Sequence, residues 1–157
     1  MTYNHIAKAY NELHKEEQKK KIELIKELLN VKKEDKLLDL GCGTAIAREF
    51  FDCDYTGVDN SKQMLKQGEG KLIFASAEKL PFKDKTFDVI ICVTAIHNFK
   101  NIKKAINEIK RVKKDNAKIA ITLLKKAKNF NKIKELLLKS FKFNTADEEK
   151  DIIFYLN

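Results

Sequence analysis

The sequence predicts an α/β protein with a mostly parallel seven-stranded sheet, helices on both faces and an antiparallel hairpin at the C-terminal end. Between residues 36 and 140, apolar segments of strand length alternate with segments of helical periodicity, as in parallel sheets. The last two strand-like segments are separated by too few residues for a crossover helix, so they must be antiparallel. A length of 157 residues suits one domain, and we expect residues 1–157 to form it.

The first predicted element is helical. Its apolar residues recur at helical spacing in two groups, separated by a polar stretch at residues 16–20. The two groups are Ile6, Ala9, Tyr10 and Leu13, and then Ile22, Ile25, Leu28 and Leu29. This pattern fits either one long helix or two shorter ones. The first group needs a surface to pack against, and the open end of the sheet is the nearest one.

Seven segments have the strand pattern: residues 36–40, 55–58, 71–75, 87–93, 118–124, 141–145 and 151–156. The fourth is apolar almost throughout, which is typical of a strand that helices cover on both faces. Helices are predicted at residues 46–51, 61–67, 102–111 and 131–140. Ser61 is the predicted N-cap of the second helix. One face of the third helix carries Ile102, Ile106, Ile109 and Val112.

Residues at the carboxyl ends of the strands are the ligand-binding candidates, because open α/β sheets bind ligands there. Gly41 and Gly43 follow the first strand and flank one residue, which permits a tight turn and lets a ligand touch the backbone. A plain strand-to-helix turn is one alternative, and a nicotinamide dinucleotide site is another. The dinucleotide motif needs a third glycine where Ile46 stands, and Asp39 would repel a pyrophosphate. Asp39 would instead attract an ammonium, which favours an adenosyl ligand that carries an amino acid.

The second strand ends at Asp59, 18 residues after Gly41. A carboxylate in this position can accept two hydrogen bonds from a ribose diol. The same carboxylate would also stabilise the N-terminus of the helix that Ser61 begins. Both roles are compatible.

Several motifs in series resemble the class I, UbiE-like methyltransferases (methyltransferase type 11). The segment LLDLGCGTA resembles their glycine-rich loop, and YTGVDNSKQML resembles their second motif. The segment FASAEKLPFKDKTFDVIICVTAIHNF resembles the adenine-binding loop and fourth strand, and AINEIKRVKKDNAKIAIT resembles the helix and fifth strand that follow. The resemblance covers residues 10–124 and implies a Rossmann-like methyltransferase fold.

The resemblance implies S-adenosylmethionine as the cofactor. The residues it assigns to cofactor binding are Tyr10, Asp39, Gly41, Cys42, Gly43, Asp59, Asn60, Met64, Ser76, Ala77 and Thr94. Asp39 and the glycines would contact the methionyl part, Asp59 the ribose and Ser76 the adenine. Tyr10 resembles a tyrosine that closes over the cofactor, so residues 1–30 are expected to form a helical lid segment.

Three positions depart from the family pattern. Ala45 replaces the third glycine. Ser76 stands where the family has an aspartate that reads the adenine amino group, which implies weaker charge assistance. Residues 115–117 replace the usual Pro-Gly-Gly turn, and Asn116 is expected to supply its left-handed conformation. The chain also lacks the insertions that build an enclosed acceptor pocket in relatives.

His97 follows the fourth strand and is expected to face the site of methyl transfer. It is the candidate general base, since imidazole titrates near neutrality. The alternative, a structural histidine at the strand end, is favoured. Cys42, Cys53 and Cys92 form no Cys-x-x-Cys pair, so we interpret them as small buried residues and predict no metal site.

The net charge of +9 comes almost entirely from lysines spread over every segment, since Arg48 and Arg111 are the only arginines. Lysine reads phosphates and bases less specifically than arginine does. RNA is therefore a candidate partner that is not favoured. No apolar run is long enough to span a membrane, and the first 21 residues lack the pattern of a signal peptide, so we expect a cytoplasmic protein.

The leading hypothesis is a methyltransferase whose acceptor, a small molecule, RNA or protein, the sequence does not identify. A second hypothesis is a cofactor-binding subunit that is inactive without a partner protein. A protein partner and a homo-oligomer are both candidate assemblies. An exposed apolar strip at residues 72–74, on an outer strand, would favour it. A nicotinamide oxidoreductase is disfavoured by Asp39 and Ile46.

Overall fold

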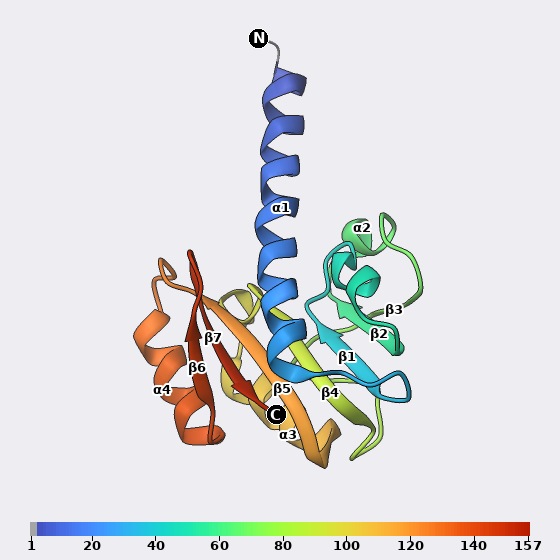
Figure 1. Ribbon diagram of the computed structural model, residues 1–157, viewed down its shortest axis with the longest axis vertical. Coiled ribbons are helices and arrows are strands. Elements are labelled where there is room, and N and C mark those ends of the chain that lie inside the picture. Colours follow the sequence, from blue (N-terminus) through green and yellow to red (C-terminus); the bar gives the residue numbers. More distant parts are fainter. Residues whose placement is uncertain (1–2) are drawn as a thin grey trace.

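A seven-stranded sheet forms the centre of the molecule (Figure 1). The computed structural model describes the backbone of residues 3–157, with the side chains of residue 9 and of residues 11–157. The strands are β1 (Lys36–Leu40), β2 (Asp54–Asp59), β3 (Lys71–Phe74), β4 (Phe87–Val93), β5 (Lys113–Leu124), β6 (Asn144–Asp147) and β7 (Asp151–Leu156). Their spatial order is β3-β2-β1-β4-β5-β7-β6. Strands β1 to β5 are parallel, whereas β7 is antiparallel to both β5 and β6, so the predicted fold class is confirmed.

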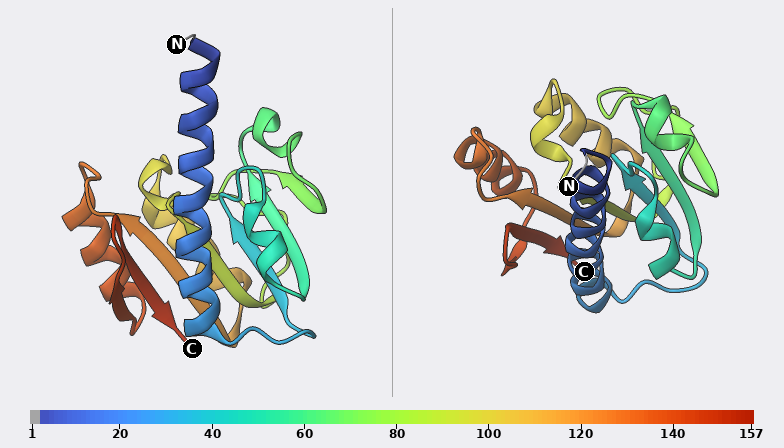
Figure 2. Two further views of the ribbon diagram at one scale, coloured as in Figure 1. Left: turned by 45° about the horizontal axis from the view of Figure 1, so that its top comes forward. Right: turned by 90° about the horizontal axis from the view of Figure 1, so that it is seen from above.

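Helices cover both faces of the sheet (Figure 2). The helical elements are α1 (Tyr3–Leu29), η1 (Ile46–Phe50), α2 (Lys62–Leu65), η2 (Ile96–Asn98), α3 (Ile102–Val112) and α4 (Phe130–Ser140), of which η1 and η2 are 3₁₀ helices. Successive strand residues point to opposite faces. Leu38, Ile90 and Cys92 therefore belong to one core cluster with α3 and α4, while Leu37 and Val89 belong to a second cluster with α1 and η1.

The N-terminal segment is one long helix, α1, whose first half extends past the carboxyl ends of β1 and β4 (Figures 1 and 2). Its second half is anchored by Ile22, Ile25 and Leu29, which are almost fully buried against the sheet. In the first half Leu13 is 60% exposed and Ala9 is exposed as well. The expected packing of this apolar face into the open end of the sheet is therefore wrong for these two residues. The side chains of Ile6 and Tyr10 lie outside the described part.

The segment predicted to be a turn around Asn116 is part of β5. No left-handed residue occurs there, and β5 begins at Lys113, where it pairs with Phe87. The register then moves from that pair to Val89 opposite Lys118, so the extra residues form a bulge. The left-handed turn was predicted wrongly because pairing with β4 extends a polar segment that has no strand pattern of its own.

Local contacts set the start of α2 and the start of β6. Ser61 is the N-cap of α2, as predicted, because its Oγ accepts a hydrogen bond from the Met64 amide at 3.3 Å. Strand β6 begins at Asn144, three residues later than expected. Phe141 instead ends α4 and packs its ring against Phe143, with the ring centres 4.9 Å apart.

Candidate functional site

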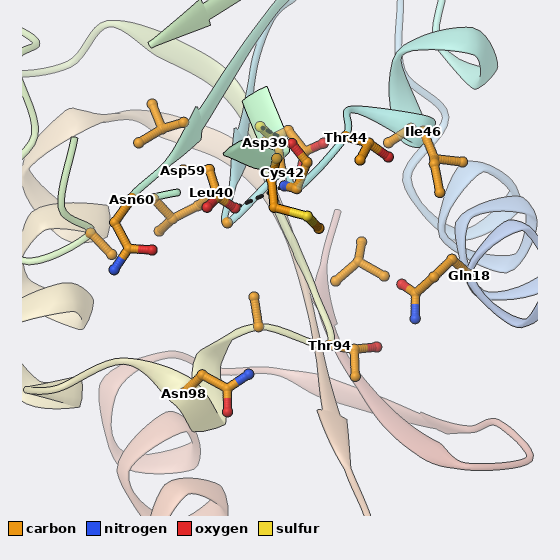
Figure 3. A pocket seen from close by; sticks show the side chains of 18 of the residues that line it. Gln18, Asp39, Leu40, Cys42, Thr44, Ile46, Asp59, Asn60, Thr94 and Asn98 are labelled. Atoms are coloured by element: carbon orange, nitrogen blue, oxygen red, sulfur yellow. Dashed lines mark hydrogen bonds between the residues drawn. The ribbon is translucent and has the colours of Figure 1, made fainter. Parts of the chain in front are cut away.

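A cleft of about 710 Å³ lies where the strand order reverses, between β1 and β4 (Figure 3). Ligands of open α/β sheets bind at this place because loops from the two halves of the sheet diverge there. The cleft is lined by the ends of β1, β2 and β4, by the loop after β3 and by one face of α1. Of the residues assigned from the sequence, ten line it: Asp39, Gly41, Cys42, Gly43, Asp59, Asn60, Met64, Ser76, Ala77 and Thr94.

The glycine loop after β1 forms the floor of the cleft. Gly41 has φ 74°, and a Cβ on it would lie 2.6 Å from the Cβ of Ala95. The amides of Gly41 and Cys42 both donate to the Val58 carbonyl, at 2.8 and 2.9 Å. Only glycine combines this backbone conformation with so close an approach of the β4 end. Ala45, which replaces a third glycine, is also left-handed, with φ 61°.

Asp59 connects the glycine loop to α2. Its Oδ2 accepts a hydrogen bond from the Gly43 amide at 2.8 Å, and its Oδ1 accepts one from the Ser61 amide at 2.9 Å. A carboxylate has about four lone-pair sites, so both oxygens can still accept bonds from a ligand. The sequence had suggested a ligand role and a helix-terminal role together, and the geometry is compatible with both.

Asp39 is a buried carboxyl at the edge of the cleft. The Tyr55 hydroxyl donates a hydrogen bond to its Oδ2. The pKa of Asp39 is raised to about 7, chiefly by burial; the hydrogen bond from Tyr55 lowers it, and the nearby Asp59 carboxylate adds to the rise. Its side-chain partner within the described residues is the neutral Tyr55, so this buried carboxyl is suited to bind a cationic group of a ligand.

Ser76, in the loop after β3, orients the carboxylate of Glu78. Its hydroxyl donates to the Glu78 carboxylate, which also accepts a bond from the Asn101 amide at 3.0 Å. Desolvation acts to raise the pKa of Glu78, but these hydrogen bonds outweigh it and hold the pKa below its usual value. Glu78 lines the cleft. An acid is therefore present at this end of the cleft two residues after the expected position.

His97 does not line the cleft. It lies in η2, and the neighbouring Ala95 and Asn98 line the cleft instead. Its Nδ1 is buried and has no hydrogen-bond partner among the described residues. Burial lowers its pKa, and Asp151 and Lys21 act on it in opposite directions. Its position gives no support to a catalytic role, which we do not propose.

The sequence predicted that residues 1–30 cover the cleft, but it did not identify the side chains of α1 that form this wall, apart from Tyr10. Among the described side chains of α1, five line the cleft: Asn11, His14, Lys15, Gln18 and Ile22. Their spacing of three or four places them on one helix face. The pattern of apolar residues in the sequence does not show that polar residues on this helix face a ligand.

The cysteines do not form a reactive or metal-binding group. Burial raises the pKa of the Cys42, Cys53 and Cys92 thiols. Within the described residues, no group of three or more His, Cys, Asp or Glu could hold a metal ion. The same part of the chain has no helix that is long and apolar enough to cross a membrane.

The family model described as "Methyltransferase domain" matches residues 38–121, which contain the glycine loop, Asp59 and β4. The chain belongs to this methyltransferase-domain family. It is 34% identical over 127 residues to the uncharacterized protein MJ1252 of Methanocaldococcus jannaschii, covering 77% of this chain and 49% of that protein. It is 32% identical over 113 residues to the demethylmenaquinone methyltransferase of Thermotoga maritima, covering 66% and 48%.

The fold is also that of solved methyltransferases. A crystal structure of a SAM-dependent methyltransferase from Aquifex aeolicus matches this methyltransferase domain with a TM-score of 0.71 at 17% identity, covering 85% of this chain and 87% of that one. The chain spans about half the length of the curated relatives it matches.

Proposed function

We propose that this methyltransferase domain binds S-adenosylmethionine in the cleft and transfers its methyl group to an acceptor. The arrangement of three carboxyl groups beside the glycine loop carries the proposal: Asp39 in β1, Asp59 at the end of β2 and Glu78 in the loop after β3. Carboxylates repel a pyrophosphate but bind ammonium, ribose hydroxyl and amino groups. These three types of group occur together on S-adenosylmethionine.

Each carboxyl fits one part of this cofactor. Asp39 would hold the ammonium, and Asp59 would accept hydrogen bonds from the ribose hydroxyls. Glu78 would accept a hydrogen bond from the adenine amino group, which is the role that sequence reasoning gave to Ser76. Met64, 40% exposed above the glycine loop, would pack against the adenosine.

The bound cofactor would supply a methyl group made electrophilic by its sulfonium. The chain contributes orientation and exclusion of water, which are the main requirements of an in-line displacement. Gly41, Ala95 and Thr94 form the floor that fixes the methionyl part, and α1 forms the wall on the open side. The acceptor would enter between that wall and the floor.

We expect S-adenosylmethionine and S-adenosylhomocysteine to raise the melting temperature, and NAD to have no effect. A ligand at a hundredfold excess over its dissociation constant stabilises a protein by about 2.7 kcal/mol. A thermal-shift titration measures this directly. Stabilisation by NAD without stabilisation by either adenosyl compound would contradict the proposal.

Asp59→Ala is expected to weaken the binding of S-adenosylhomocysteine by roughly 1.5–3 kcal/mol, the range for hydrogen bonds to a charged group. The fold should lose less, about 1 kcal/mol, because the variant gives up two backbone hydrogen bonds at a half-buried position. Calorimetry measures the affinity and chemical denaturation the stability. Asp52→Ala, which removes an exposed carboxylate, is the control. Unchanged affinity in the Asp59 variant would remove Asp59 from the site.

We also propose that the first turns of α1 act as a lid on the cleft. Asn11 and His14 line the cleft, while exposed Leu13 contributes little packing to the fold. Deletion of residues 1–14 is therefore expected to leave the melting temperature nearly unchanged and to weaken cofactor binding. Hydrogen exchange at residues 3–14 should slow when S-adenosylhomocysteine binds. Identical exchange with and without the ligand would rule out the lid, and with it the role proposed for Tyr10.

The exposed apolar strip at residues 72–74, which would favour a subunit that depends on a partner, is not present. Leu72 and Ile73 are half-buried against the core, which leaves only Phe74 of this strip exposed, at 54%. The ammonium of Lys62 lies 4.9 Å from the centre of the Phe74 ring and partly covers it. A cytoplasmic location stays a prediction from the sequence, and RNA stays a candidate partner that is not favoured.

A further inference from the structure

Thr94, the first residue after β4, has a left-handed backbone with φ 50°. This conformation is unfavourable for a β-branched residue and persists only where the surroundings fix it. Thr94 also lines the cleft, and its successor Ala95 lies against Gly41 in the floor. The groups that fix Thr94 therefore bear on the shape of the proposed cofactor site.

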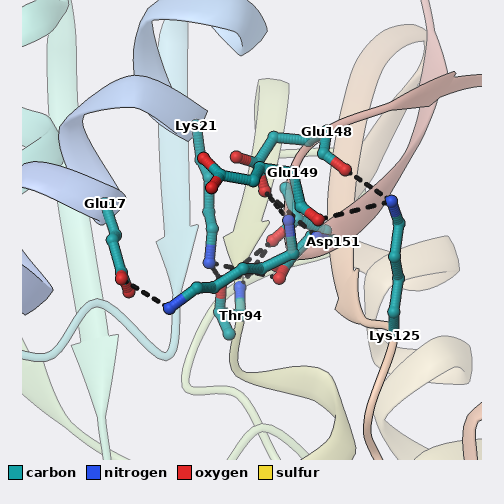
Figure 4. Close-up of polar contacts among 9 residues, drawn as sticks. Glu17, Lys21, Thr94, Lys125, Glu148, Glu149 and Asp151 are labelled. Atoms are coloured by element: carbon teal, nitrogen blue, oxygen red, sulfur yellow. Dashed lines mark hydrogen bonds and ion pairs between the residues drawn. The ribbon is translucent and has the colours of Figure 1, made fainter.

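Three side chains from other elements hold Thr94, and two of them, Lys21 and Asp151, are labelled in Figure 4. Its hydroxyl accepts a hydrogen bond from Lys21 Nζ at 3.1 Å and donates one to Asp151 Oδ2 at 2.7 Å. Its amide donates to Thr122 Oγ1 at 2.7 Å. These partners come from α1, from the first residue of β7 and from β5, so three separate parts of the chain converge on one residue.

Lys21 and Asp151 form an ion pair at 3.1 Å, with side chains that are 3% and 0% exposed. A buried ion pair contributes little to stability relative to apolar residues of similar volume. It is, however, directional, because the ammonium and the carboxylate each need a fixed partner. Here the two groups are ion-paired, and each of them also forms a hydrogen bond with the hydroxyl of Thr94.

We propose that Lys21 and Asp151 are positioning residues for methyl transfer, which hold Thr94 in its left-handed conformation and so keep Ala95 against the glycine loop. The proposal rests on the cofactor site proposed above. Without the pair, Thr94 would relax toward an extended conformation, and Ala95 would move away from Gly41. The methionyl part of the cofactor would then lose the floor on which it lies.

A simpler role, attachment of α1 to the sheet, can be tested separately. Glu17 and Lys150 form a second ion pair between α1 and the turn before β7. This second pair makes no bond to Thr94, whose bonded side chains among the described residues are those of Lys21, Thr122 and Asp151. It therefore provides a matched control that loosens the attachment of the helix and leaves the Thr94 hydroxyl bonded.

The experiment replaces both members of each pair, because removal of one member would leave a buried charge without a partner. Calorimetry with S-adenosylhomocysteine is expected to show about tenfold weaker binding for Lys21→Met/Asp151→Val, which corresponds to about 1.4 kcal/mol. Glu17→Gln/Lys150→Gln should bind within about twofold of the wild type. Equal losses in the two double variants, or no loss in the first, would overturn the inference. Failure of the wild type to bind would instead refute the proposed function.

A glycine at position 94 provides the decisive readout, since glycine adopts the left-handed conformation without help. In a Thr94→Gly background, whatever its own affinity, Lys21→Met/Asp151→Val should cause no further loss. A persistent tenfold loss in that background would show that the pair acts by another route. If the double variant does not fold, Thr94→Val, which removes only the hydroxyl, should reproduce the tenfold loss, and wild-type affinity in it would refute the inference.

Discussion

Gly41→Ala is expected to abolish detectable binding of S-adenosylhomocysteine and to lower the free energy of unfolding by about 2–4 kcal/mol. Two effects combine. The new Cβ would lie 2.6 Å from the Cβ of Ala95, and the φ of 74° is unfavourable for any residue with a side chain. Relief of the overlap requires the glycine loop and the end of β4 to separate. These are the two segments that form the floor of the cleft.

Gly70→Ala separates the two effects in Gly41→Ala. Gly70 is also left-handed, with φ 103°, but its Cβ would meet only the flexible Arg48 side chain outside the cleft. This variant should lose about 1–2 kcal/mol of stability, the cost of a left-handed conformation for a residue with a side chain, and keep its affinity. Denaturation and calorimetry on both variants make the comparison. Wild-type affinity in Gly41→Ala would show that the glycine loop does not bind the cofactor.

The affinity for S-adenosylhomocysteine is expected to rise about tenfold between pH 6 and pH 8. Burial gives Asp39 a pKa of about 7, so at pH 6 only about a tenth of the molecules carry the carboxylate that binds an ammonium. Asp39→Asn should bind at least tenfold more weakly than the wild type at pH 8 and should lose the rise. Calorimetry across this pH range measures both. A wild-type affinity that is flat with pH would exclude Asp39 as the ammonium partner.

The Asp39 carboxyl also makes the stability of the ligand-free protein depend on pH. Its pKa is higher in the folded state than its ordinary value of 3.8, so between pH 4 and pH 7 the folded state binds more protons than the unfolded state. Stability contributed by Asp39 therefore falls as the pH rises through this range. Asn is neutral at every pH, and Asp39→Asn should remove this part of the fall. Chemical denaturation at pH 5 and pH 7 measures it.

The sequence predicted those parts of the fold that local burial decides. The strand predicted at residues 87–93 has the same bounds as β4. An almost continuous apolar run is enough to identify a strand that is covered on both faces. The start of β5 was missed, because Lys113 and its polar neighbours become a strand only through pairing with Phe87. The cleft residues of the glycine loop, β2 and β4 were predicted from motifs whose position relative to strands is fixed.

The residues missed at the site are those that meet only through the tertiary structure. Lys21 and Asp151 are 130 positions apart, and a lysine inside a lysine-rich helix gives no sign that it is buried. The one feature of the sequence that could have indicated burial of Lys21 is its position directly before Ile22, in the apolar group of the helix. His97 was expected at the cleft, but the tight turn of η2 brings Asn98 there instead.

The convergence of α1 and β7 has a consequence for biosynthesis. Lys21 leaves the ribosome early, but the carboxylate that binds it belongs to residue 151, and β7 must insert between β5 and β6. Contacts between such distant parts of a chain form slowly, because a large loop must close first. The cleft is therefore completed only after β7 has been translated, later than the strands that line it. Until then, the apolar face of α1 has no finished sheet to cover.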